Sequence, residues 1–474
     1  MNALAPARTA PAPSPPPAPT QSAMNPRTRR LLEGPILATL LRLAWPNTLV
    51  MLAQASVGLI ETWWVSHLGT EALAGLALVF PGYMLMQMLS AGAIGGGISS
   101  AIARALGANK REDADSLFSH ALIINGGLGL FFSALFLLFG REFYAALGGE
   151  GGALDAALAY SDVVFAGAVL VWLGNAFASV LRGTGNMALP SFAIILGVAL
   201  LLPLSPLLIY GLGPVPGMGV AGAGWAVVLT SALTAGLLGW AVFTGRSIAR
   251  PRRGKPQARL FGDILRVGAV ASISTFQTTA TVALTTALVA HAGGTDAVAG
   301  YGTGSRLEYL LIPLVFGLGA PLVALVGTNI GAGQRQRALR IAMTGAGIAF
   351  LICEAVGIAA AIWPRAWLGL FGADPAMLDT GSAYLRLVGP TYGFFGMGLA
   401  LYFASQGAGR LLWPLAAGFL RLVVAVAGGF LAISLGTGLQ GVFAALAVAL
   451  VIYGALVGGL VGGGVWFRGD GRWG

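Results

Sequence analysis

The chain contains twelve long apolar segments separated by short polar stretches, and this pattern leaves few folds open to it. Each segment is long enough to cross the hydrocarbon core of a membrane, which takes about 20 apolar residues in a helix. Their length and unbroken apolarity favour helices over the strands of a membrane β-barrel, which alternate in polarity and span in about ten residues. The sequence therefore predicts an all-α membrane protein with 12 transmembrane helices. The segments cover residues 43–66, 72–106, 116–139, 154–181, 188–212, 218–244, 264–292, 297–326, 338–363, 378–405, 411–435 and 442–467.

The amino-acid composition excludes an ordinary water-soluble globular protein. Hydrophobic residues make up 57% of the 474 residues, charged residues only 9%, and the mean hydropathy is +0.82. The net charge of +10 does not indicate a nucleic-acid partner, because the basic residues lie mostly at span ends and not in one patch. Cys353 is the only cysteine, so the chain can form neither an internal disulfide nor a cysteine metal site.

The segment Gly245–Gly262 divides the twelve spans into two sets of six, and it is basic, with no acidic residue. Adding 224 to positions before this linker repeatedly gives the same residue type after it. Matches among charged, His, Tyr and Pro residues, which are scarce here, indicate a tandem duplication, the usual architecture of secondary transporters. The pairs include Arg42/Arg266, His67/His291, Arg111/Arg335, Arg141/Arg365, Asp155/Asp379, Tyr160/Tyr384 and Pro190/Pro414.

The duplication also predicts how the two halves are related. Because six is even, both copies begin on the same side of the membrane, and their pseudo-two-fold axis runs along the membrane normal. A cleft is then expected between two six-helix bundles. The expected divisions are a disordered cytoplasmic tail (1–35), an N-terminal bundle (36–244), a basic cytoplasmic linker (245–262), a C-terminal bundle (263–467) and a cytoplasmic tail (468–474).

Lys and Arg are divided unevenly between the two sides of the predicted spans. One side, which includes the linker and both termini, has 23 of them, and the other has only Arg141 and Arg365. This asymmetry predicts that both termini and the linker are cytoplasmic. The first 23 residues are rich in Pro and Ala and have no hydrophobic core, so they do not read as a secretory signal peptide, and Met24 is an alternative start.

Several short motifs follow the order of one known transporter family. The first span holds Trp45-Pro46 and ends in Glu61-Thr62-Trp63-Trp64-Val65-Ser66-His67-Leu68-Gly69, and the second closes on Ala103-Arg104-Ala105-Leu106-Gly107-Ala108. Leu181-Arg182-Gly183-Thr184-Gly185-Asn186, Gly304-Ser305-Arg306-Leu307-Glu308 and Gly327-Thr328-Asn329-Ile330-Gly331-Ala332-Gly333 follow. Over roughly Ile36 to Phe467 the chain resembles the multidrug and toxic compound extrusion (MATE) family of the multidrug/oligosaccharidyl-lipid/polysaccharide flippase superfamily.

The resemblance implies a secondary antiporter that exports amphipathic, often cationic organic compounds in exchange for H⁺ or Na⁺. The two bundles would rock around a central site to give alternating access. It further implies a multi-pass protein of the bacterial inner membrane, acting as a monomer without a cofactor.

An ionisable group inside a span costs about 2.5–3.5 kcal/mol on insertion, so each such group is a candidate for ion coupling. Glu61 lies where the resembled family has its first-span acid, about 7–8 Å from the outer end of its span. A coupling or substrate role is therefore expected, and the alternative is a carboxylate that reaches the outer interface or bonds to Thr or Trp neighbours.

Four further charged residues within the spans are candidates for coupling. Arg306 and Glu308 are two residues apart and do not face each other on a straight helix, so each has a different partner or the helix is broken. Glu354 is either a coupling acid or a carboxyl bonded to a neighbouring helix. Asp162 is equivalent to Arg386 in the repeat, and we expect the two to pair across the mouth of the cleft.

The chain departs from the family at two coupling positions. Ser205 occupies the place of a second acid found in the fifth span of many proton-coupled members. Gln277 replaces an acid of sodium-coupled members in the seventh span, and no carboxylate occurs between Tyr384 and Gln406. With fewer full charges to hold a sodium ion, H⁺ is the expected coupling ion, and no metal site is expected.

Polar residues inside the spans are candidates to line the substrate path. Each could instead make an interhelical hydrogen bond, which contributes about 0.6 kcal/mol on average. The candidates are Gln54, Gln87, Asn125, Asn175, Ser205, Gln277, Tyr301, Tyr392 and Gln406.

The sequence disfavours two alternatives to drug export. A flippase for lipid-linked saccharides would have the same pair of bundles, but such proteins have a strongly cationic cavity, whereas few arginines lie within these spans. A membrane-embedded enzyme is disfavoured because the chain has three histidines and lacks His-Glu-x-x-His, Gly-x-Ser-x-Gly and phosphate-loop patterns.

Overall fold

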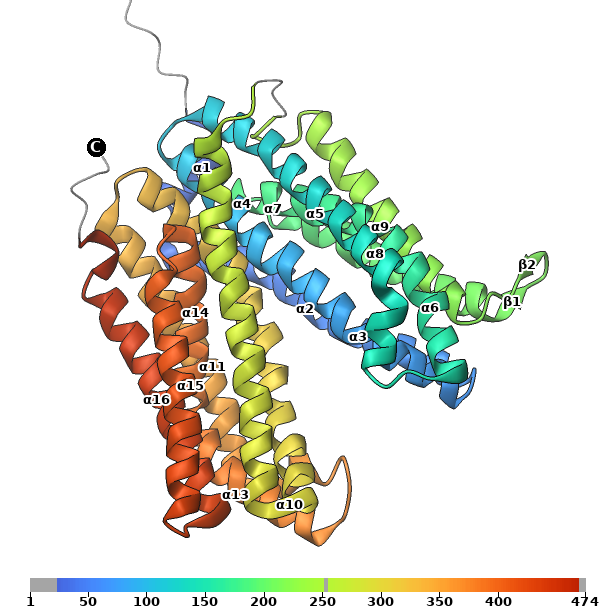
Figure 1. The fold of residues 1–474 in the computed structure, drawn as a ribbon. Coiled ribbons are helices and arrows are strands. Elements are labelled where there is room, and N and C mark those ends of the chain that lie inside the picture. The colour runs from blue at the N-terminus through green and yellow to red at the C-terminus, as the bar shows by residue number, and fades with distance from the viewer. Residues whose placement is uncertain (1–23, 251–254, 469–474) are drawn as a thin grey trace, which may run out of the picture.

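The computed structural model describes residues 24–250 and 255–468 and consists of two helical lobes that meet at one end (Figure 1). We call this end, where α1 and the linker lie, the linker end. From it the lobes diverge toward the opposite end. The N-terminal lobe contains α2 to α9, and the C-terminal lobe contains α10 to α16.

The N-terminal part contains the following elements in chain order. They are α1 (Pro26–Glu33), α2 (Ile36–Ser66), α3 (Thr70–Gln87), the π-helix η1 (Met88–Ile94), α4 (Gly95–Gly107), α5 (Arg111–Ala146), α6 (Gly151–Ala166), α7 (Ala168–Gly183), α8 (Ala188–Tyr210), β1 (Gly211–Leu212), β2 (Val215–Pro216) and α9 (Val220–Phe243). The two short strands pair antiparallel and turn the chain at the opposite end.

The C-terminal lobe begins with α10 (Ala258–Gly331), which is two spans joined at Gly294. At that glycine φ is 72° and ψ is −162°, a non-helical conformation that favours glycine. The remaining elements are α11 (Arg335–Ile362), α12 (Pro364–Leu368), α13 (Pro375–Val388), the 3₁₀ turn η2 (Gly389–Thr391), α14 (Tyr392–Ala408), α15 (Leu412–Ser434), α16 (Gly438–Gly462) and the 3₁₀ turn η3 (Val465–Phe467).

The predicted twelve spans are confirmed. Eleven helical stretches in the described part are long and apolar enough to cross a membrane, and the bent pair α6 and α7, at 47° to each other, forms the twelfth. Several helices extend past the apolar segments. For example, the apolar segment 116–139 lies within α5, which covers residues 111–146.

Two segments differ from the expected divisions. Residues 26–33, assigned from sequence to a disordered tail, form α1, which buries Leu31 and Leu32 against the body of the protein. Helix α10 starts at Ala258, inside the segment predicted as linker. Arg252 and Arg253 of the linker, residues 1–23 and residues 469–474 lie outside the described residues.

Each lobe has its own hydrophobic core, and each core includes the start of the other copy's first span. Leu40 and Ala44 of α2 are buried in the core of the C-terminal lobe. Leu260 and Ile264 of α10 are buried in the core of the N-terminal lobe. Because Leu40 and Ile264 are 224 positions apart, the exchange follows the pseudo-two-fold symmetry that the repeat predicts.

Candidate substrate and coupling site

Direct contacts between the lobes are concentrated at the linker end. Ser100 Oγ of α4 donates to the carbonyl oxygen of Gln406 (2.6 Å), and Gln406 Nε2 donates to the carbonyl oxygen of Gly92 (3.1 Å). Arg104 Nη1 donates to the carbonyl oxygen of Gly407 (3.2 Å). Gln406 is only 1% exposed, so the structure places this predicted path residue in the closed junction between the lobes.

Two glycines allow the helix backbones to touch where α4 crosses the end of α10. A Cβ at Gly107 would lie 3.0 Å from Cα of Thr328 and closer still to its carbonyl oxygen. A Cβ at Gly331 would lie 2.9 Å from Cα of Arg104, again with the carbonyl oxygen closer. Gly107 and Gly331, like Arg104 and Thr328, are 224 positions apart, so this crossing lies at the pseudo-two-fold axis.

One side of α2 leads from this junction into the region where the lobes diverge. Asn47, Gln54 and Glu61 are seven residues apart, nearly two turns, and therefore lie on the same side of the helix. Asn47 Nδ2 donates to the carbonyl oxygens of Phe316 (3.0 Å) and Gly317 (3.2 Å) in the other lobe. Gln54, farther from the linker end on the same side, is exposed.

Glu61 is a partly buried carboxyl group with no bonding partner for one of its oxygens. Its Oε1 atom is inaccessible and unpaired, as is Nε1 of Trp64 one turn along α2. Tyr83 of α3 and Tyr160 of α6 lie close enough to the carboxylate to interact with its charge. An unpaired acceptor and an unpaired donor on one helix turn are suited to a proton or to a polar group of a ligand.

Predicted path residues in the N-terminal lobe form a short hydrogen-bonded chain beside the π-helix η1. Gln87 Nε2 donates to Tyr83 Oη (2.9 Å), and Asn175 Nδ2 donates to Gln87 Oε1 (3.3 Å) and Ser90 Oγ (2.8 Å). The chain reaches Tyr83 and thereby the surroundings of Glu61. Ser205 is buried on α8 with its Oγ unpaired.

In the C-terminal lobe, Glu308 and Arg306 have different partners, which was one of the two outcomes expected for them. Glu308 Oε1 is paired with Arg421 Nη2 of α15 at 3.1 Å. The guanidinium of Arg421 also lies over the rings of Phe395 (5.5 Å) and Tyr453 (5.8 Å). Arg306 is exposed.

Three tyrosines pack close to the Glu308 pair. Tyr301 and Tyr384 contact edge to face at 5.2 Å, and Tyr392 Oη lies 3.4 Å from Tyr384 Oη. Tyr384 and Tyr392 lie near Glu308, and Tyr160 lies near Glu61. Tyr160 and Tyr384 are repeat equivalents, so each lobe places the same tyrosine near its own carboxylate.

Glu354 stabilises a helix start. Pro390 lacks a backbone N–H and interrupts the span between α13 and α14. Glu354 Oε2 accepts the backbone N–H of Gly393 (2.8 Å), in the first turn of α14. The carboxylate thus bonds to a neighbouring helix, one of the two alternatives set out for it, and a negative charge is favourable at a helix N-terminus.

The other predicted residues are not brought together in one site. Asn125 is fully buried and donates to the carbonyl oxygen of Ala121 (2.9 Å). Gln277 Nε2 bonds to Thr281 Oγ1 (2.9 Å) and the carbonyl oxygen of Gly418 (3.0 Å), which joins α10 to α15. Asp162 and Arg386 are both exposed, and in the part of the chain that the structure describes they form no ion pair with each other.

Residues that the sequence reasoning did not single out complete these arrangements. Asn47 joins the lobes and is preceded by Trp45-Pro46, a motif that marked the family but not this contact. Arg421 lies on α15, and nothing in the sequence linked it to Glu308. Tyr83 of α3 and Tyr160 of α6 lie near Glu61.

Two pseudo-symmetric six-span lobes that close at one end, with a few carboxyl groups within the spans, define a secondary transporter. The MatE family profile matches residues 46–207 and 271–431, one stretch in each copy of the repeat. The chain belongs to this family, whose members are transporters that move small organic compounds with ion coupling.

Similar proteins cover nearly the whole chain. The FAD transporter of Shewanella oneidensis is 28% identical over 399 residues, which cover 83% of this chain and 87% of that protein. A probable multidrug resistance protein NorM of Thermotoga maritima is 26% identical over 386 residues, covering 81% and 82%. A crystal structure of MATE in complex with MaD3S has a TM-score of 0.85 and 28% identity, covering 94% of this chain and 98% of that one.

Proposed function

We propose that the protein is a secondary antiporter that exports amphipathic, cationic organic compounds in exchange for H⁺ by alternating access. Glu61 is the proposed coupling residue, and it binds the proton and the cationic cargo in turn. Gln54, Gln87 and Asn175 are proposed to line the path in the N-terminal lobe. Relatives named as probable multidrug resistance proteins or as a multidrug export protein support the export of organic compounds.

The observation that carries this proposal is the difference in pairing among the acids within the spans. Glu308 is neutralised by Arg421, and Glu354 is held by a backbone N–H. Glu61 has an oxygen that is buried without a partner. A carboxyl group that is not bound to a fixed cation can take up and release a mobile one at low cost.

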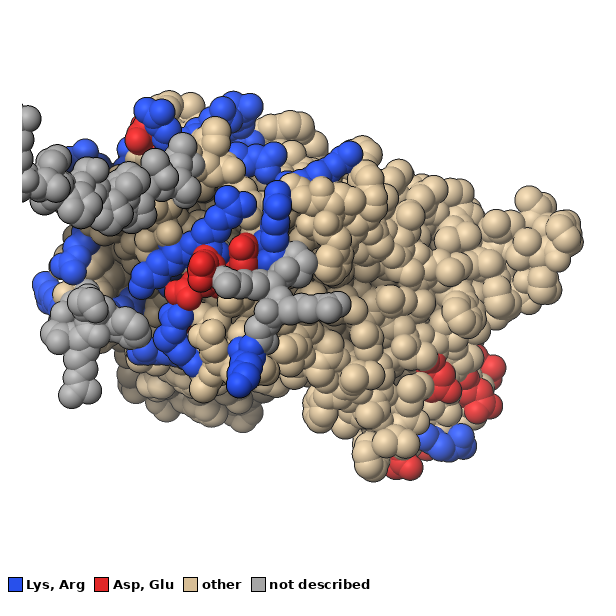
Figure 2. Space-filling model, turned by 90° about the horizontal axis from the view of Figure 1, so that it is seen from above, with Lys and Arg blue, Asp and Glu red and all other residues tan. Residues whose placement is uncertain are grey.

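We further propose that the linker end faces the cytoplasm of a bacterial inner membrane and that the protein acts as a monomer. The asymmetry of Lys and Arg supports this orientation. Figure 2 views the molecule from the linker end and shows basic side chains gathered there. In this orientation the lobes are in contact on the cytoplasmic side, and the described conformation is the outward-facing one.

The test is efflux of ethidium from cells that produce wild type, Glu61→Gln or Glu142→Gln, with the proton and sodium gradients collapsed separately. Glu142 is an exposed acid on α5 and is the matched control. We expect collapse of the proton gradient to stop wild-type efflux and Glu61→Gln to lose it, while Glu142→Gln retains it. Full efflux by Glu61→Gln would show that coupling occurs elsewhere, and a requirement for sodium alone would exclude H⁺.

An anionic aromatic substrate is a second candidate function. Arg306 and Arg386 are exposed on the C-terminal lobe, and exposed guanidinium groups favour an anion. One relative is named as an FAD transporter. Vesicles loaded with ethidium or with FAD distinguish the two candidates, because only the FAD assay should respond to Arg306→Gln.

A further inference from the structure

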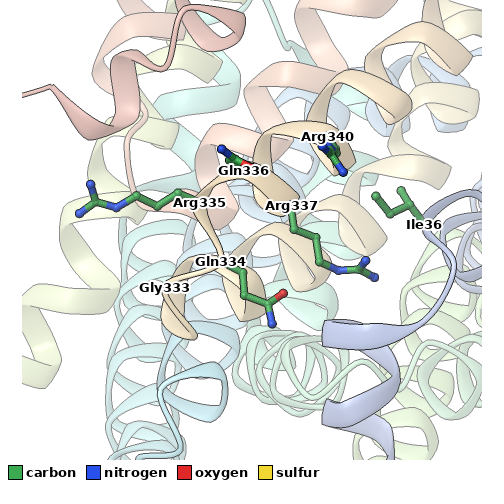
Figure 3. Close-up of a pocket in the computed structure, with 7 residues that line it drawn as sticks. All are labelled: Ile36, Gly333, Gln334, Arg335, Gln336, Arg337 and Arg340. Atoms are coloured by element: carbon green, nitrogen blue, oxygen red, sulfur yellow. The ribbon is translucent and has the colours of Figure 1, made fainter.

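A pocket at the linker end lies between the start of α2 and the start of α11. Its volume is about 490 Å³, and its lining includes Ile36, Arg335, Arg337 and Arg340 (Figure 3). We propose that this pocket binds the phosphate group of an anionic membrane lipid in the leaflet at the linker end.

The internal repeat provides the first argument, because it shows what the equivalent helix start contains. Helix α5 begins with acids in its first turn, and Asp113 pairs with Arg259 at 2.9 Å. Asp115 Oδ1 accepts the backbone N–H of Arg250 (2.7 Å). Acids at this place complement the partial positive charge of a helix N-terminus.

Helix α11 has the opposite charge at the same repeat positions. Asp113 is replaced by Arg337 and Ser116 by Arg340, while Gln336 stands in place of Glu112. No acid lies in the first turn, and the N-cap residue makes no side-chain bond to the helix. Among the described residues, the first turn of α11 therefore supplies no acid to the positive helix end or to Arg337 and Arg340, and an external anion is favourable there.

The positions of the two guanidinium groups define where the anion would bind. In Figure 3 the side chains of Arg337 and Arg340 point toward Ile36, whereas Arg335 points away. Arg337 donates through Nη2 to the carbonyl oxygen of Gly34, which fixes its position, and its Nε is buried without a hydrogen-bond partner. Arg340 is exposed and, in residues 24–250 and 255–468, forms no ion pair.

The apolar surface of α2 favours a lipid over a free anion. Leu37, Leu41 and Trp45 are 53%, 47% and 60% exposed and follow one another at four-residue intervals, beginning directly after Ile36. They form an apolar stripe that runs from the pocket along the span. A lipid can place its phosphate at the arginines and an acyl chain on this stripe, as basic pockets at span ends allow.

A lipid bound there would also stabilise the closed junction. Arg337 bonds to Gly34, and Asn329 Nδ2 bonds to the carbonyl oxygen of Leu31 (3.1 Å), so the C-terminal lobe is already tied to the segment that leads into α2. A ligand held between α2 and α11 adds a further link between these segments. Binding to this conformation raises its stability by mass action.

The test measures the thermal unfolding midpoint of the purified full-length protein in an uncharged detergent. Phosphatidylglycerol, phosphatidylcholine or inorganic phosphate is added to wild type, Arg340→Gln, Arg340→Lys and Arg111→Gln. Arg111 is exposed at the start of α5 and is the repeat equivalent of Arg335, so it is a matched control outside the pocket. Because Arg340 is exposed and unpaired, the lipid-free midpoints are expected to agree.

We expect phosphatidylglycerol to raise the midpoint of wild type, Arg340→Lys and Arg111→Gln in a saturable manner. Arg340→Gln should lose most of that rise, and phosphatidylcholine and phosphate should give none. An equal rise for Arg340→Gln, or an equal loss for Arg111→Gln, would overturn the proposal. So would an equal rise with phosphatidylcholine or with inorganic phosphate, because neither result requires an anionic lipid in this pocket.

Discussion

Replacing Gly331 by alanine tests whether the crossing of α4 and α10 holds the lobes closed at the linker end. The added Cβ would lie 2.9 Å from Cα of Arg104, and ordinary contacts begin at 3.4 Å. The helices must therefore separate by at least 0.5 Å (3.4 − 2.9), and by more to clear the carbonyl oxygen. Backbone atoms cannot rotate away from the methyl group as a long side chain can.

The cost of this separation falls on one conformation of the transporter. A gap of about 0.5–1 Å already forfeits a quarter to a half of each van der Waals contact. Forcing an extra methyl group into a packed contact typically costs about 1–3 kcal/mol. Because the proposed alternating access separates α4 from the end of α10 in the other conformation, the closed population should fall by about 5- to 150-fold relative to that conformation.

The assay is the distance between spin labels at positions 150 and 373, both exposed at the opposite end, in a Cys353→Ala background. We expect Gly331→Ala and Gly107→Ala to shift the distribution toward shorter distances. Gly347→Ala is the control, because a Cβ there meets nothing within 4 Å. An unchanged distribution in folded Gly331→Ala and Gly107→Ala would refute the view that this crossing controls the closed state.

Two further predictions concern the paired acids. Glu308→Gln leaves the guanidinium of Arg421 without its counter-charge, so the free energy of unfolding in detergent should fall by about 3 kcal/mol, the lower end for a buried pair, since the side chains of Glu308 and Arg421 are 20% and 19% exposed. Adding Arg421→Met should recover part of that loss, and an equally unstable double variant would contradict the pairing argument. Glu354→Gln should retain ethidium efflux because its amide oxygen still accepts the N–H of Gly393, whereas Glu354→Ala should lose about 1 kcal/mol of stability. Loss of efflux in Glu354→Gln with normal protein levels would reassign coupling to this acid.

The twelve spans and the duplication could be predicted from sequence because they depend on patterns local to the chain or fixed in spacing. Hydrophobic length determines whether a segment spans, and the offset of 224 needs only scarce residues in register. Helix α1 was missed because three arginines and a glutamate in eight residues make its segment polar, although Leu31 and Leu32 are buried on one side. Its helical state depends on contact with the lobes.

The candidate site was predicted less completely, since pairing depends on which helices are neighbours. Glu308 and Arg421 are 113 positions apart, and no periodicity connects them. Gln406 and Gln277 are polar residues in spans, as Gln54 is, yet they bond across helices whereas Gln54 is exposed. The sequence shows which span positions are polar. Only the packing of the lobes shows which of these side chains are exposed and which bond to a neighbouring helix.

The two copies of the repeat agree at positions where helices pack together, but they differ at the acids within the spans. Positions that agree in both copies, such as Gly107 and Gly331, lie at the crossing where the lobes close.

The acids within the spans have no such counterparts. Glu61 corresponds to Thr285, and Glu308 corresponds to Met84. The two lobes therefore carry their acids at different positions of the repeat, and the carboxylate of Glu308 is paired with the guanidinium of Arg421. The two lobes thus have equivalent helices but different charged groups within their spans. We therefore expect ion exchange at Glu61 to drive the movement of the lobes, while the Glu308–Arg421 pair keeps the C-terminal lobe rigid.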